Sequence, residues 1–126
     1  MKIGVAYNFF DGEELLESSI KSIRNNVDYI TVIYQQISNF GINSKINIKD
    51  FLQDLVDRKL IDEFIDYKPR VGAGGHFNEI VKRNLGLYEC SRHNCTHFLL
   101  MDSDEFYTDE QFKNAKQELL NDDYDS

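Results

Sequence analysis

Several residue types are scarce in this chain of 126 residues: tryptophan is absent, proline occurs once and cysteine twice. Two cysteines are too few for a disulfide framework. No apolar run approaches the roughly 20 residues needed to cross a bilayer, and the segment Met1 to Gly4 lacks the apolar stretch and cleavage site of a signal peptide. These absences predict a protein with no transmembrane segment, and the cytoplasm is its expected compartment.

Basic residues are also few, because 14 Lys and Arg stand against 22 Asp and Glu and give a net charge of -8. Nine of the acidic residues fall in the segment 102–126. Proteins that bind nucleic acid normally carry a basic stripe for the phosphates, and the sequence contains none. We therefore expect no nucleic-acid partner, and the acidic C-terminal segment favours cations instead.

What remains is the composition of a folded protein. Hydrophobic residues make up 41% of the chain, which is enough for a packed core, and there are only seven glycines. This composition disfavours disorder. The length allows one compact domain at most. We expect a single domain over residues 1–126.

The spacing of apolar residues predicts strands that alternate with helices. The expected strands are 2–7, 29–34, 61–67 and 96–101, and the expected helices are 12–25, 48–60, 76–93 and 108–120. Thr108 followed by Gln111 is typical of a capping box at the start of the last helix. The third helix carries a set of apolar residues near one face: Phe77, Ile80, Val81, Leu85 and Leu87.

This alternation predicts an α/β fold with a doubly wound, mostly parallel sheet and helices on both faces. Ligands of such sheets bind beyond the carboxyl ends of the strands, which here means segments 8–11, 35–39 and 102–105. The glycine-rich run 71–75 precedes a helix, and it has two interpretations: a phosphate-binding loop or a flexible connection.

The strongest chemical signal is an apolar strand, FLLM, followed by Asp102 and Asp104. In an extended chain, carboxylates two residues apart point to one side, where they can hold Mg²⁺ or Mn²⁺ and, through the metal, a diphosphate. An acidic turn that caps the next helix would have the same sequence. The motif alone leaves both interpretations open.

Cys90, His93, Cys95 and His97 form a series of residues that suit zinc. We set a zinc site aside because these residues straddle an expected helix end and strand start, without the tight knuckle that usually pairs two zinc ligands. The two cysteines also lack the spacing of a redox pair.

Two longer segments carry a family resemblance. RNLGLYEC (83–90) followed by THFLLMDSDE (96–105) resembles the inverting family-2-like glycosyltransferases, in which an R-N-x-G-L-x-x-A helix leads into an apolar strand that ends in a DxD motif. VAYN (5–8), followed by the apolar positions of the first helix, is similar to the first strand and Y-N turn of that family. The matching segments extend over most of the chain in the same order.

The resemblance implies a GT-A fold that binds a nucleotide-diphosphate sugar and transfers the sugar to a hydroxyl of a glycan or another acceptor. Asp102 and Asp104 would hold Mn²⁺ or Mg²⁺, and Asp102 would also lie near the diphosphate or ribose. The remaining substrate-binding residues carried over by position are Tyr7 and Asn8 against the nucleotide and Arg83 and Asn84 near the diphosphate. Haloacid dehalogenase phosphatases also place DxD after an apolar strand, but they expect Thr or Val where Phe106 stands.

The sequence departs from the family pattern in two respects. The second strand is followed by Gln35 and Gln36 where the family has an acidic pair, so Gln36 is the expected nucleotide contact and the identity of the base stays open. The acceptor site and catalytic base of the family lie well beyond the DxD motif, whereas the chain stops at Ser126. We therefore expect a truncated GT-A unit with its catalytic base unassigned. The alternative is a truncated, non-catalytic α/β binding module.

Overall fold

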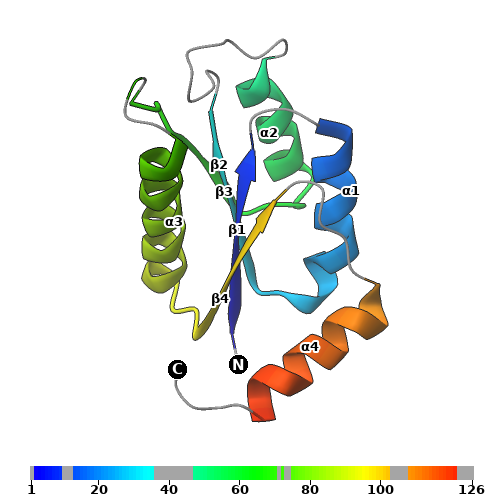
Figure 1. Cartoon of the computed structure of the whole chain (residues 1–126). Helices are drawn as coiled ribbons and strands as arrows, with labels where there is room; N and C mark the ends of the chain where they lie inside the picture. The colour runs from blue at the N-terminus through cyan, green and yellow to red at the C-terminus, as the bar shows by residue number, and fades with distance from the viewer. Residues whose placement is uncertain are drawn as a thin grey trace.

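The computed structural model describes residues 2–9, 13–35, 47–70, 72, 75–102 and 108–121. Strands and helices alternate along the chain (Figure 1). In order, the elements are β1 (Ile3–Phe9), α1 (Glu13–Ile23), a 3₁₀ turn η1 (Arg24–Asn26), β2 (Tyr29–Tyr34), α2 (Ile48–Asp57), β3 (Glu63–Asp66), α3 (Gly75–Arg92), β4 (His97–Asp102) and α4 (Asp109–Asn121).

The four strands form one sheet in the order β3-β2-β1-β4, and every neighbouring pair is parallel. This confirms the predicted α/β class with a parallel, Rossmann-like sheet. All six residues of β2 are buried, as expected for a central strand covered on both faces. β3 is shorter than its predicted range, whereas β1 continues two residues beyond the predicted end, to Phe9.

Helices cover both faces of this sheet (Figure 1). α1 and α2 lie on one face and α3 lies on the other. The main hydrophobic core fills the α1 and α2 side, where Leu16, Ile20 and Leu52 are fully buried against the strands. Each fully buried side chain of this size contributes roughly 1.5–3 kcal/mol. None of the helices in the described ranges has the length and apolar content that a bilayer-spanning helix requires.

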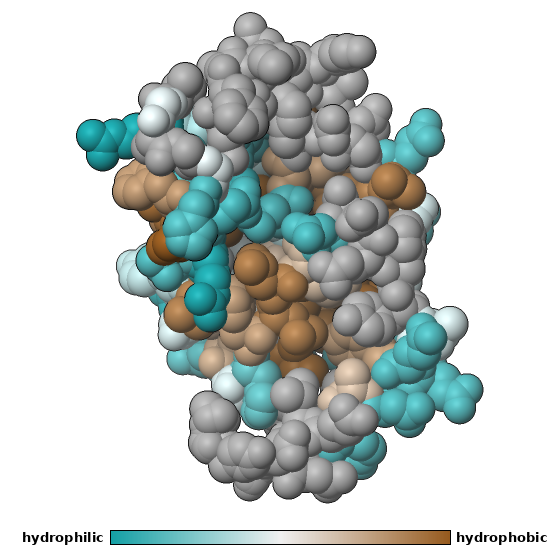
Figure 2. All heavy atoms as spheres, in the orientation of Figure 1, coloured by the Kyte–Doolittle hydropathy of each residue, from teal (hydrophilic) through white to brown (hydrophobic). Residues whose placement is uncertain are grey.

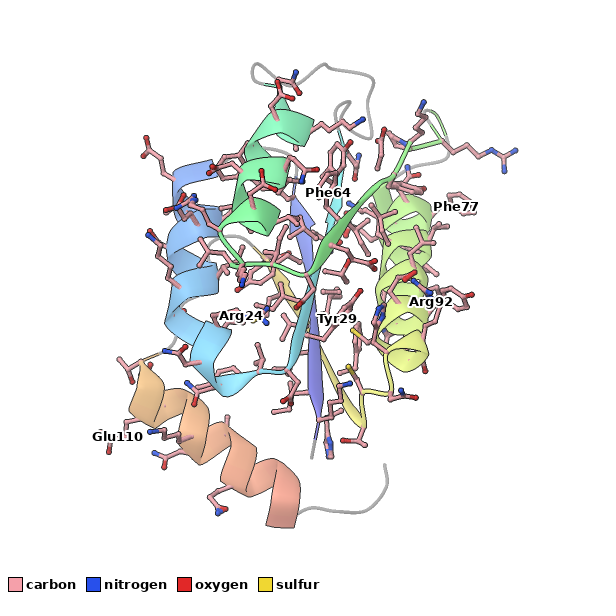
Figure 3. The ribbon with its side chains drawn as sticks, turned by 180° about the vertical axis from the view of Figure 1, so that it is seen from behind. Arg24, Tyr29, Phe64, Phe77, Arg92 and Glu110 are labelled. Carbon is pink, nitrogen blue, oxygen red and sulfur yellow. The ribbon has the colours of Figure 1, made fainter. Side chains whose placement is uncertain are left out.

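α3 turns an unexpected side toward the sheet. The residues that it buries recur every fourth position, on one stripe of the helix: Asn78, Lys82, Gly86 and Cys90. Phe77, Ile80 and Leu87, three members of the predicted apolar set, are 41%, 46% and 46% exposed. Figure 3, seen from behind, shows Phe77 on the side of α3 that faces away from the sheet. The apolar pattern therefore located the helix but did not indicate its buried face.

Small residues explain why this stripe faces inward. A Cβ atom on Gly86 would lie 2.6 Å from the Cβ of Ala6 in β1, closer than two carbon atoms can approach. With glycine at this position, the backbone of α3 lies close against the central strand. Polar side chains on the same stripe then find partners at the end of the sheet, as described below.

α4 begins as the sequence predicts. Thr108 N donates to Gln111 Oε1 at 3.0 Å, and Gln111 N donates to Thr108 Oγ1 at 3.1 Å, so the capping box is confirmed. Phe112 is buried, and the helix lies next to α1 and η1. α4 therefore extends the layer that covers the α1 side of the sheet (Figure 1).

β4 is an edge strand, since it pairs only with β1 among the described strands. Figure 2 shows apolar atoms at the surface in the middle of this view, over the part of the sheet where Figure 1 places β4. Leu100 of this strand is 39% exposed. The edge beside Asp102 therefore presents apolar surface as well as a carboxylate.

Candidate functional site

The strand order creates a switch point between β1 and β4. From β1 the chain adds β2 and β3 on one side of the sheet, and it then returns to place β4 on the other side of β1. Connections on the two sides of such a point diverge and leave a crevice beyond the carboxyl ends of the strands, where α/β proteins bind ligands. Asn8 and Asp102 are paired in register at the carboxyl ends of β1 and β4. The structure therefore brings two of the sequence-predicted site residues together at the switch point.

Asn8 is half-buried at this edge. Its Nδ2 donates to Glu79 Oε2 at 3.3 Å. Its Oδ1 is buried and accepts no hydrogen bond from any residue that the structure describes. An amide oxygen without a partner is costly unless a ligand, an ion or water completes it.

Lys82 is the buried cation of the site. Its Nζ donates to Gln35 Oε1, just after β2, and forms an ion pair with Glu79 Oε1 at 2.8 Å. The side chain of Lys82 is 6% exposed, whereas that of Glu79 is 50% exposed. A buried ammonium group needs such partners because its removal from water costs several kcal/mol.

Glu79 connects these groups. One carboxylate oxygen contacts Lys82 and the other accepts from Asn8, so a single anion bridges a cation and an amide donor at the carboxyl ends of the strands. Glu79 comes from the exposed side of α3, one turn before Arg83. The arrangement shows that this edge of the sheet already accommodates an oxyanion.

Asn78 holds the segment after β3 against α3. Its Oδ1 accepts from Tyr67 Oη at 2.5 Å and from Arg70 N at 2.9 Å. The guanidinium of Arg70 lies 5.8 Å from the ring centre of Phe77. Burial, and then the charge of Glu79, raises the pKa of Tyr67 above its ordinary value. These contacts fix the chain that leads from β3 toward the glycine-rich run, of which residues 71, 73 and 74 lie outside the described ranges.

The other predicted site residues are placed as follows. Tyr7 is fully buried, and its Oη is 2.8 Å from Ser19 Oγ, so it lies in the core under α1. Arg83 and Asn84 are exposed on α3, outside the buried stripe that carries Lys82. Gln36 and Asp104 lie outside the described residues, and their predicted roles stay predictions.

The sequence motif pointed to Arg83 on this helix, whereas Glu79 and Asn78 were missed. Lys82 stands beside Arg83 in the family-like motif, and the motif drew attention to the exposed arginine. One signal was available: Asn78, Lys82 and Gly86 share a four-residue spacing, so they occupy one helix stripe. Neither composition nor periodicity indicates that a polar stripe faces the sheet.

Oxygen atoms at the switch point suit a hard divalent cation. Asp102 is exposed at the end of β4, in register with Asn8 of β1, and carboxylate and amide oxygens are ligands that Mg²⁺ and Mn²⁺ accept. Within the described ranges, no three His, Cys, Asp or Glu side chains gather closely enough to hold a metal. The oxygen atoms of Asn8 and Asp102 are therefore of the kind that such a metal binds. Asp104 would have to contribute further oxygen ligands.

Comparison with protein-family models finds no match to this chain, and comparison with curated proteins finds none either. The function of this chain is therefore inferred from its own residues and from the motifs quoted above.

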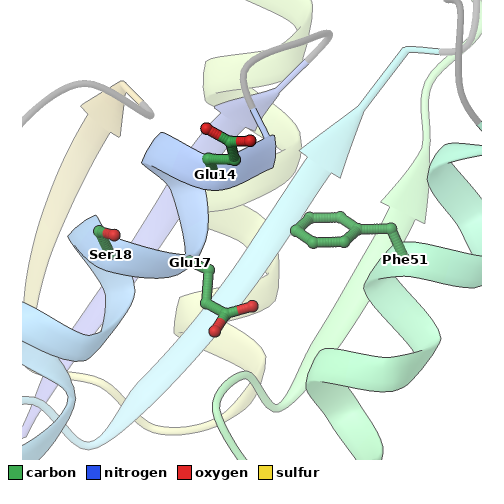
Figure 4. Close-up of a pocket in the computed structure, with 4 residues that line it drawn as sticks. All are labelled: Glu14, Glu17, Ser18 and Phe51. Carbon is green, nitrogen blue, oxygen red and sulfur yellow. The ribbon is translucent and has the colours of Figure 1, made fainter.

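A pocket of about 270 Å³ lies elsewhere, between α1 and α2. Glu14, Glu17, Ser18 and Phe51 line it (Figure 4). Arg58, followed by Lys21, lowers the pKa of Glu17 to about 2, so this carboxylate is engaged in ion pairs. Because α1 and α2 cover the face opposite α3, the pocket is separated from Lys82 by the sheet (Figure 1).

A second polar cluster lies near the amino ends of β2 and β3. Tyr29 stacks on His93 with ring centres 4.1 Å apart, and Arg92 pairs with Glu89. Burial, and then Glu63, raises the pKa of Tyr29. Figure 3 shows Tyr29 at the sheet and Arg92 on the lower part of α3. Parallel sheets bind ligands at their carboxyl ends, so this position favours a structural role for the cluster.

Proposed function

We propose that the chain is the donor-binding unit of a metal-dependent, GT-A-type glycosyltransferase and that it binds a nucleotide-diphosphate sugar at the switch point between β1 and β4. The observation that carries this proposal is the register of Asn8 against Asp102 at the carboxyl ends of those strands. The parallel sheet and its order support it, since this edge is where α/β folds bind nucleotides.

The contacts of Glu79 support a diphosphate as the ligand. Its carboxylate is bound by Lys82 and Asn8, and a phosphate oxygen offers the same negative charge and hydrogen-bond acceptors. A diphosphate at this edge would take over the contact with Lys82, while Glu79, half of whose side chain is exposed, would turn toward solvent. Glu79 would therefore compete with the ligand, and its removal would strengthen binding.

Asp102 and Asp104 would hold the divalent metal, Mn²⁺ or Mg²⁺. When bound, that ion neutralises the charge that grows on the departing nucleoside diphosphate. Lys82 contributes a second positive charge from the protein itself, already oriented by Gln35. Arg83, Asn84 and Gln36 remain proposed donor contacts, the acceptor is a hydroxyl of a glycan or another molecule, and the catalytic base is unassigned. A cytoplasmic location remains a prediction of the sequence.

Calorimetry tests the proposal directly. The chain is titrated with UDP-, GDP- and CDP-sugars in the presence of Mn²⁺ and again in the presence of a chelator. We expect binding of at least one donor that requires the metal and is lost in Asp102→Asn. We expect Lys82→Met to weaken binding about tenfold or more, because it removes a charge-assisted contact. No metal-dependent binding of any donor would refute the proposal.

Glu79→Gln provides a second arm with a matched control. This variant should bind the same donor more tightly than the wild type, whereas Glu110→Gln, on exposed α4, should bind it equally (Figure 3). Weaker binding by Glu79→Gln would contradict competition between this carboxylate and the diphosphate. Release of nucleoside diphosphate with an acceptor present would separate a transferase from a non-catalytic binding module.

A further inference from the structure

The two cysteines lie at the C-terminal end of α3, where a specific turn brings them together. Cys95 N donates to Cys90 O at 3.0 Å and Asn94 N donates to Ser91 O at 3.0 Å. Asn94 has a φ of 64°, the left-handed conformation at which such helix ends reverse. These two bonds and this φ define a Schellman motif.

α2 ends in the same motif, and the comparison shows what its two outer positions do. Leu60 N donates to Leu55 O at 2.9 Å, and Lys59 N donates to Val56 O at 2.9 Å, with a φ of 62° at Lys59. The two residues joined by the hydrogen bond that spans more of the chain, here Leu55 and Leu60, commonly make an apolar contact across the turn. In α2 these positions hold two leucines, whereas in α3 they hold Cys90 and Cys95.

Gly4 provides the space for both sulfur atoms. A Cβ on this residue of β1 would lie 2.6 Å from Cys90 Sγ and 2.7 Å from Cys95 Sγ. The two thiols therefore share one site above a glycine of a central strand. Both cysteines are free thiols in this structure.

The two thiols differ in access and in acidity. Cys90 is 1% exposed, and burial raises its pKa to about 12. Cys95 is only half-buried, and although burial also raises its pKa, the charge of Lys2 opposes that effect. Lys2 is held close by, since its Nζ donates to His93 O at 2.6 Å. Cys95 is therefore the thiol that a reagent from solvent reaches and that forms a thiolate more readily.

We propose that Cys90 and Cys95 form a dithiol modification site that a small-molecule disulfide converts into an intramolecular disulfide. The Cys95 thiolate attacks one sulfur of the reagent, which forms a mixed disulfide and releases one small thiolate. Cys90 then loses its proton to solvent, and its sulfur attacks Cys95 Sγ and releases the second small thiol. The protein loses two electrons and two protons, and the reagent is reduced to two thiols.

This site does not depend on the proposed donor-binding function. Four residues separate Cys90 from Cys95, and this spacing does not indicate a redox pair. The Schellman turn is what brings the two cysteines together. The new bond would join the end of α3 to the connection that enters β4.

The experiment treats the full chain with glutathione disulfide, quenches it with acid and measures intact mass and free thiols. The wild type should lose two hydrogens and both thiols and retain no glutathione. Cys90→Ser should retain one glutathione on Cys95. Cys95→Ser should react at least about tenfold more slowly than the wild type, because only the buried thiol remains. A wild type that keeps glutathione or forms disulfide-linked dimers would refute the proposal, as would a Cys95→Ser variant that reacts at the wild-type rate.

A second measurement needs no variant. The same reaction is run on the wild type unfolded in urea, where the Schellman turn no longer holds the thiols together. The fraction of protein that carries glutathione should rise relative to the intramolecular disulfide, because the second thiol must then find the first by chain diffusion. An equal ratio of the two products in folded and unfolded protein would show that the folded geometry contributes nothing.

Discussion

Replacing Gly86 by alanine tests how closely α3 lies on the sheet. In an exposed helix interior, this change stabilises a protein by about 0.8–1.0 kcal/mol, because alanine has the higher helix propensity. In this structure the new Cβ would lie 2.6 Å from Ala6 Cβ and 3.3 Å from Ile33 Cδ1. Ala6 Cβ is attached directly to the backbone of a central strand, so it cannot turn aside as a long side chain would.

The expected sign is therefore the reverse of the usual one. Overpacking of a core costs about 1–3 kcal/mol, and the short distance to an immobile atom places this site in the upper part of that range. After the gain in propensity, Gly86→Ala should lower the free energy of unfolding by about 1–2 kcal/mol. Ser91→Ala, on the exposed side of the same helix, is the control and should leave stability unchanged or slightly raised.

Urea unfolding followed by far-UV circular dichroism measures both changes. Ala6→Gly removes the atom that Gly86→Ala would meet, so the double variant should be more stable than the sum of the single effects by about 1 kcal/mol or more. If Gly86→Ala instead raised the free energy of unfolding by about 1 kcal/mol, and if it showed no coupling to Ala6→Gly, then α3 would present a different face to the sheet. The contacts of Lys82 described above would then be incorrect.

Two further predictions concern stability. Arg58 and Lys21 lower the pKa of Glu17 from 4.5 to about 2, so its carboxylate stabilises the fold above pH 4.5 and loses this contribution as the pH falls toward 2. Because the side chain is 28% exposed, Glu17→Gln should cost at most about 1 kcal/mol near neutral pH, with no difference from wild type near pH 2; a constant difference would contradict this. Thr108→Ala should lower the free energy of urea unfolding by about 1 kcal/mol, because the variant loses the side-chain cap of α4. Thr108→Ser keeps a hydroxyl at this position and should retain the stability of the wild type.

Much of the fold could be predicted because its signals are local. The run YITVIY at 29–34 is β-branched and aromatic and forms the fully buried β2. Thr108 and Gln111 form the capping box that their spacing indicates. In both cases the information lies within a few neighbouring residues.

The orientation of α3 could not be predicted, because it depends on residues far apart in the sequence. Gly86 packs on Ala6 and Cys90 on Gly4, and Lys82 finds its acceptor on Gln35. Lys82, Gly86 and Cys90 share a four-residue spacing, but that spacing does not indicate that they face the sheet, and the exposed apolar residues produced a misleading pattern. For the same reason, the sequence indicated Asn8 and Asp102 from strand ends but gave no weight to Glu79.

We propose that the switch point between β1 and β4 binds a divalent metal together with a nucleoside diphosphate. Mn²⁺ is paramagnetic, so its position can be read from the amide signals that it broadens in an NMR spectrum of the ¹⁵N-labelled chain. With UDP and Mn²⁺ added, we expect the strongest broadening at Asn8 and Asp102 and the weakest at residues far from them, such as Glu110. Broadening centred on the pocket beside Glu14 and Glu17, or none that depends on the nucleotide, would contradict it.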